Sequence, residues 1–85
     1  MISNKTIPNN LHHHRIQSGL RQIDVAHALG LESSDRISLW EKRTAVPHLV
    51  NLFKLARLYR TQIEKLYAEV FEEAVIGIRK TPENE

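Results

Sequence analysis

The sequence contains no cysteine, and its 85 residues include only three glycines and three prolines. Without cysteine, the chain can form neither a disulfide nor a thiolate zinc site. No apolar run approaches the roughly 20 residues that span a bilayer. Residues 1–10 also lack the apolar segment of a secretory signal. We therefore expect one small cytoplasmic domain with no membrane contact.

The sequence also lacks the motifs that indicate catalysis. It has no cysteine nucleophile, no glycine-rich phosphate loop and no HExxH motif, and no pair of carboxylates shares a helix face in a cleft. His12, His13 and His14 are consecutive, so on a helix they project about 100° apart and cannot bind one metal ion together. We expect no enzymatic activity, no cofactor and no metal site.

Positive charge is concentrated in the first part of the chain. Residues 1–60 contain nine Lys/Arg and four Asp/Glu, whereas residues 61–85 contain three and six. The two parts carry +5 and −3, which sum to the +2 of the whole chain. A basic segment is expected of a phosphate-binding surface, but a charge of this size also occurs on ordinary solvated surfaces.

Two helical segments joined by a glycine turn lie within residues 19–47. Residues 22–29 contain no Gly or Pro, and their apolar residues repeat at helical spacing. Gly30 follows, where a positive φ ends many helices. Two serines of N-cap type come next, and Ile37 and Trp40 then lie three apart on the inner face of another helix. Two helices joined in this way form the DNA-binding helix-turn-helix.

Further helices are expected on both sides of this segment. A short helix over residues 11–18 turns Leu11 and Ile16 toward the core. Another helix starts at Pro47, and a last one runs from about residue 61 to residue 78 without an interrupting Gly or Pro before Gly77. The helix after Pro47 has a broad apolar face, made of Leu49, Leu52, Phe53, Leu55, Ala56 and Tyr59.

The same order of residues occurs in a known family. The matching positions are Leu11, Arg15, Gly19-Leu20, Gln22, Val25-Ala26, Leu29-Gly30-Leu31, Ile37-Ser38, Trp40-Glu41, Pro47, and Leu52 to Ala56. Together they resemble the phage-repressor and Cro-type (XRE-like) helix-turn-helix family over roughly residues 10–67. The resemblance implies an all-α, compact five-helix lambda-repressor-like domain at residues 10–67. It also implies a flexible arm at residues 1–9 and a C-terminal helical extension and tail at residues 68–85.

The resemblance implies a sequence-specific regulator of transcription that binds double-stranded DNA. In this family, the glutamine that opens the second helix and the loop after the third helix hold the phosphate backbone, while the third helix reads bases in the major groove. The phosphate contacts expected here, with two nearby arginines added, are Arg15, Arg21, Gln22, Lys42, Arg43 and Thr44. The base contacts expected here are Ser34, Asp35, Arg36, Ser38 and Leu39.

Three positions depart from the family pattern. Arg21 replaces the Ser or Thr that usually caps the second helix, so we expect a weaker cap there. One extra residue lies among residues 32–34, which leaves open which serine caps the third helix. Arg43 replaces a glycine, so a positive φ at this position carries strain. Trp40 is expected in the core rather than on the DNA, because it shares the inner face with Ile37.

An antitoxin or another protein-binding module of the same fold is the alternative to a DNA-binding protein. The third helix distinguishes the two, because a DNA reader needs polar or basic side chains on its outer face and a protein binder tends to be apolar there. Serines and Arg36 favour DNA, whereas Leu39 and Asp35 fit it less well. We expect DNA to be the partner, with a toxin not excluded.

An apolar stripe continues beyond the end of the family domain. It either packs back on the domain or contacts a second copy. We expect a homodimer, because one helix-turn-helix reads only a half-site and a palindromic operator places two half-sites about 34 Å apart. The expected protein is therefore a dimeric repressor. The residues of this stripe are Val70, Phe71, Ala74, Val75 and Ile78.

Overall fold

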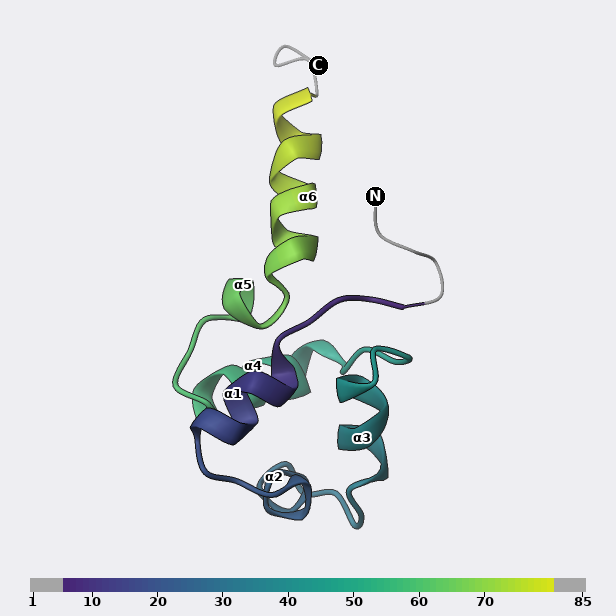
Figure 1. The fold of residues 1–85 in the computed structure, drawn as a ribbon, viewed down its shortest axis with the longest axis vertical. Coiled ribbons are helices and arrows are strands. Elements are labelled where there is room, and N and C mark those ends of the chain that lie inside the picture. Colours follow the sequence, from purple (N-terminus) through teal and green to yellow (C-terminus); the bar gives the residue numbers. More distant parts are fainter. Residues whose placement is uncertain (1–5, 81–85) are drawn as a thin grey trace.

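Short helices make up the regular structure of this chain. The computed structural model describes residues 6–80, and within that range it contains six α-helices and no strand. α1 to α5 surround a common core, and α6 extends away from them (Figure 1). The prediction of an all-α fold is confirmed. The helices are α1 Leu11–Gln17, α2 Gln22–Ala28, α3 Asp35–Glu41, α4 Leu49–Leu58, α5 Ile63–Leu66 and α6 Ala68–Lys80.

The core is built from one face of each helix in the body. Val25 of α2, Ile37 of α3 and Leu55 of α4 are each at most 1% exposed. Trp40 is 5% exposed, which confirms its expected place in the core. Leu66 of α5 is fully buried as well. The spacing of apolar residues therefore placed the centre of the domain correctly.

The edges of two helical faces were predicted wrongly. Ile16 is 55% exposed, and its neighbour Arg15 is buried one turn after Leu11. Leu49 and Phe53 of α4 are 64% and 56% exposed, because they lie on the flank of a narrower buried face that contains Leu52, Leu55, Ala56 and Tyr59. An apolar patch on α4 therefore faces solvent.

Four helices of the described chain end with the same backbone motif. After α1, α2, α3 and α4, one residue has a φ between 54° and 80°; these residues are Gly19, Gly30, Arg43 and Arg60. Each donates its N–H to the carbonyl three residues earlier, and the next residue donates to the carbonyl five residues earlier. This Schellman motif satisfies carbonyls that the helix end leaves open. The positive φ expected at Gly30 is confirmed, and so is the strained φ at Arg43.

The last helix is interrupted at Tyr67, so the prediction of one continuous helix from about residue 61 was wrong. Tyr67 has a φ of −126° and a ψ of 55°, which separates α5 from α6. Leu66 and Tyr67 are both buried in the core although they are neighbours in the chain. On a straight helix they would point about 100° apart. The break brings both side chains into the core and directs α6 away from the body (Figure 1).

The segment before α1 is attached to the body. The Ile7 N–H donates to the Arg43 carbonyl at 3.1 Å. The Asn9 side chain is buried, and its amide donates to the Trp40 carbonyl at 2.8 Å. The flexible arm expected over residues 1–9 is therefore held in place from Ile7 onward. Its first five residues lie outside the described part of the chain.

Candidate nucleic-acid interface

The residues predicted to read bases lie on the outer face of α3. Asp35, Arg36 and Leu39 are exposed, and Ser38 is half-buried at the edge of the same face. Ile37 and the tryptophan three residues later occupy the opposite face, where they anchor α3 in the core. The exposed face of α3 combines a guanidinium, a carboxylate, a hydroxyl and an apolar side chain. These groups can contact base edges in a major groove.

The turn before α3 accommodates the extra residue without disturbing the helix. The Ser33 hydroxyl oxygen accepts a hydrogen bond from the Asp35 N–H at 3.3 Å. Ser34 occupies the N-cap position, but its side chain makes no capping bond. The two serines therefore have different roles, which the sequence left open. Ser34 remains beside the outer face of α3.

The start of α2 is stabilised by an acid rather than by a Ser or Thr cap. The Asp24 carboxylate accepts the backbone N–H of Arg21 at 2.8 Å. It also accepts two bonds from the Arg21 guanidinium, at 3.0 and 2.9 Å. The side-chain bonds from Arg21, with the backbone bond, lower the pKa of Asp24 to about 2. The weaker cap expected here is therefore offset, and the charge of Arg21 is balanced locally.

Arg15, one of the predicted phosphate contacts, is buried inside the domain and bound to Glu41. Its Nε donates to Glu41 Oε2 at 2.6 Å, and its Nη2 donates to Glu41 Oε1 at 3.1 Å. Nη1 donates to the Leu20 carbonyl at 2.9 Å. The Gln22 amide reaches Glu41 Oε1 at 3.1 Å, so it also points toward this carboxylate.

Glu41 belongs to the family pattern, but the sequence alone gave it no role; in the structure it accepts hydrogen bonds from side chains of two other helices. Burial of its carboxylate opposes ionisation, but hydrogen bonds from Arg15, Gln22 and His12 outweigh burial and lower the pKa of Glu41. Since these donors come from α1 and α2, the last residue of α3 ties three helices together. The sequence did contain a signal for a buried ion pair. Arg15 lies one turn after Leu11, so the helical period places it on the buried face of α1, where it needs a partner of opposite charge.

The loop after α3 presents positive charge to solvent. Lys42 and Arg43 are exposed, and neither side chain forms an ion pair within residues 6–80. Thr44 is exposed as well, and its hydroxyl donates to the Leu39 carbonyl at 3.1 Å. The Schellman motif and the bond from Ile7 hold the loop backbone on both sides of Arg43. The loop therefore carries two unpaired cations on a fixed backbone.

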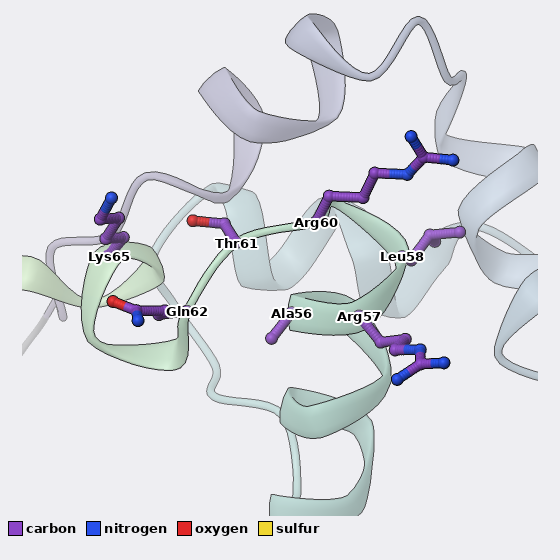
Figure 2. Close-up of a pocket in the computed structure, with 7 residues that line it drawn as sticks. All are labelled: Ala56, Arg57, Leu58, Arg60, Thr61, Gln62 and Lys65. Atoms are coloured by element: carbon purple, nitrogen blue, oxygen red, sulfur yellow. The ribbon is translucent and has the colours of Figure 1, made fainter.

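A hollow of about 890 Å³ at the junction of α4 and α5 offers a different kind of site. It is lined in part by Arg57, Arg60 and Lys65, whose charged ends point away from one another in Figure 2. Diverging cations do not surround one small anion. In the described part of the chain, no three His, Asp or Glu side chains gather closely enough to hold a metal ion.

Comparison with known proteins agrees with this geometry. A family model described as helix-turn-helix matches residues 11–66, about two thirds of the chain and close to the residues 10–67 expected from the sequence. No curated protein and no solved structure matches the chain. Between residues 6 and 80, no helix combines the length and the apolar character needed to cross a bilayer.

Proposed function

The chain belongs to the XRE/phage-repressor-type helix-turn-helix family of DNA-binding regulators, and on this premise we propose that it is a repressor that binds a palindromic operator as a homodimer. The observation that carries the proposal is that two suitable surfaces lie next to each other. The outer face of α3 is polar and exposed, and the loop that follows it presents Lys42 and Arg43 without an ion pair within the described residues. Binding, rather than catalysis, is the activity that these surfaces support.

Base readout is assigned to the outer face of α3. Arg36 can form two hydrogen bonds to guanine, Asp35 can accept one from cytosine, and Leu39 can contact the methyl group of thymine. Ser34 and Ser38 lie four residues apart, so they add hydroxyl groups on the same side of this face. Each bidentate contact discriminates between bases by roughly 1–3 kcal/mol.

Phosphate contacts are assigned first to Lys42, Arg43 and Thr44. Arg21 and Gln22 have a supporting role, because both side chains already donate to carboxylates of the protein. Arg15 is left out of the interface, because its guanidinium is buried and bound to Glu41. Phosphate contacts of this kind set the position of the protein on DNA without reading sequence.

Dimerisation is assigned to α6. Phe71 and Ile78 are 43% and 72% exposed, and Ala74 between them is exposed too. Val75 is half-buried at one edge of the same stripe, and Val70 at the other edge packs against the core of its own chain. A second copy would cover this stripe and supply the second helix-turn-helix that a palindrome requires.

Selection of bound sequences from random duplex DNA at moderate salt tests this function. We expect an enriched palindrome whose half-sites are separated by about one helical turn, roughly 34 Å. Arg36→Ala should relax the preference at one base-pair position in each half-site. Arg60→Ala is the matched control, because this exposed arginine lies at the end of α4 and outside the proposed interface. A folded protein that enriches no sequence would contradict the proposal.

A further inference from the structure

Two apolar surfaces of the described chain are largely exposed to solvent. One is the stripe on α6, which extends away from the body (Figure 1). The other lies on α4, where Val50 and Phe53 are 63% and 56% exposed. Beside these two side chains, a hollow of about 450 Å³ separates α4 from the end of α2, where Leu29 lies. We refer to this hollow, with its two exposed apolar side chains, as the α4 groove.

The charges beside the α4 groove are positive. Lys54 and Arg57 line it together with the apolar residues, and both are exposed. Within residues 6–80, neither side chain forms an ion pair. A groove lined by apolar side chains and by two cations suits a helix that carries apolar residues between acids.

The charges beside the α6 stripe are negative. At 100° per residue, Glu72 lies beyond Val75 on one side of the stripe and Glu73 lies beyond Val70 on the other. Both glutamates are exposed, and neither forms an ion pair within the part of the chain that the structure describes. The α6 stripe is therefore flanked by negative charge, opposite in sign to the charge that lines the α4 groove.

We propose that the α4 groove of one copy holds α6 of a second copy, with the apolar stripe against Val50 and Phe53 and with Glu72 and Glu73 near Lys54 and Arg57. The inference rests on the proposed homodimer and assigns the surface that the dimer uses. The lengths are compatible, since α6 has 13 residues and α4 has 10, or about 20 and 15 Å. Two-fold symmetry makes the contact reciprocal, so both grooves and both stripes are covered at once.

Direct pairing of two α6 helices is the simplest competing arrangement. It would cover the two stripes but leave Val50 and Phe53 of both copies in water. It would also leave Lys54 and Arg57 without the acids that match them in number. Docking in the α4 groove satisfies the apolar and the charged groups of both surfaces together.

Cysteine crosslinking tests the arrangement, since the chain has no cysteine of its own. Protein with Ala74→Cys is mixed with protein carrying Phe53→Cys and then oxidised mildly. We expect a disulfide that joins one copy of each variant. Ile16→Cys replaces Phe53→Cys in the matched control, because Ile16 is similarly exposed, at 55%, but lies on α1. The control mixture should give little crosslink.

Other crosslinking outcomes overturn the arrangement. Efficient coupling of Ala74→Cys to itself in a dimer would show that α6 pairs with α6, and the proposed dimer would then remain while the α4 groove is rejected. A disulfide within single copies of the double variant Phe53→Cys/Ala74→Cys would show that the groove holds the α6 of its own chain. A full-length chain that sediments as a monomer at high micromolar concentration would reject both the groove and the dimer. DNA selection would still report separately on sequence readout.

Charge exchange gives a second test that does not depend on a crosslink. The double variants Glu72→Lys/Glu73→Lys and Lys54→Glu/Arg57→Glu should each dimerise at least tenfold more weakly than the original chain. An equal mixture of the two variants should dimerise strongly again, because each α6 then meets a groove of opposite charge. Circular dichroism of each variant shows whether it remains folded. Folded variants whose mixture fails to recover would overturn the proposal.

Discussion

Arg15 and Glu41 form a two-point ion pair that joins α1 to the end of α3. Nε lies 2.6 Å from Oε2, and Nη2 lies 3.1 Å from Oε1. The two side chains are only 10% and 7% exposed, so the pair is shielded from water and salt. The Gln22 amide donates to the same carboxylate from α2. The relative positions of the two helices of the motif therefore depend on a buried polar cluster as well as on the apolar core.

Glu41→Gln should destabilise the domain strongly. The amide keeps the shape of the side chain but leaves the buried guanidinium of Arg15 without a negative partner. We expect a loss of about 3 kcal/mol in the free energy of unfolding, measured with urea. Asp24→Asn is the matched control, since it removes the exposed ion pair to Arg21, and it should change stability much less. Equal losses in the two variants would contradict this prediction.

The stability of the protein should fall in acid. A carboxyl group whose pKa is lower in the folded state stabilises the fold above its unfolded pKa, which for Glu is about 4.3. That stabilisation is lost as the pH drops through the lower, folded pKa. Since the pKa of Glu41 is lowered by its donors, thermal unfolding midpoints should fall as the pH decreases below about 4. Glu41→Gln should show a shallower decline, and parallel curves for the two proteins would contradict the assignment.

Replacing either strained arginine by glycine should stabilise the fold. Arg43 and Arg60 have φ values of 70° and 54°, where a side chain costs roughly 1–2 kcal/mol. Glycine removes this strain but adds freedom to the unfolded chain, so we expect a net gain of about 0.5–1 kcal/mol in urea unfolding for each variant. Their effects on DNA should differ. Arg43→Gly should weaken binding to all duplexes and lower the salt slope by about one. Arg60→Gly should leave binding unchanged, and equal effects would remove Arg43 from the interface.

Substitutions of two neighbouring residues of α3 should have different effects, one on stability and the other on DNA binding. Trp40→Ala should reduce the free energy of unfolding by about 3–5 kcal/mol, because the indole is 5% exposed in the core. Leu39→Ala should change stability little, because that side chain is 46% exposed, but should alter the base preference at one position. Urea unfolding and DNA selection on both variants check the pair. Lost affinity at unchanged stability in Trp40→Ala would contradict the core assignment.

Local sequence rules predicted most of the fold. The helical period found the body helices, and the residue after α2 was correctly expected to have a positive φ because it is glycine. The family pattern located the motif and also the strained position of Arg43. These features depend on residues close together in the chain. For the same reason, the outer face of α3 could be proposed as the reading surface before its geometry was known.

The tertiary structure alone decided which flank of each helix is buried, where the last helix breaks, and what the polar side chains bind. Leu49 satisfies the apolar period of α4 and still faces solvent, because burial depends on which helices lie beside it. Arg15 appeared to be a surface cation until the end of α3 placed a carboxylate against it. Tyr67 ends α5 because it and its neighbour enter the same core. The sequence by itself determined the first four helices and the motif, since these arise from local periodicity and residue type, and its family pattern indicated the DNA-binding class. Packing between distant segments determined the partners of each side chain, because those contacts exist only once the chain has folded.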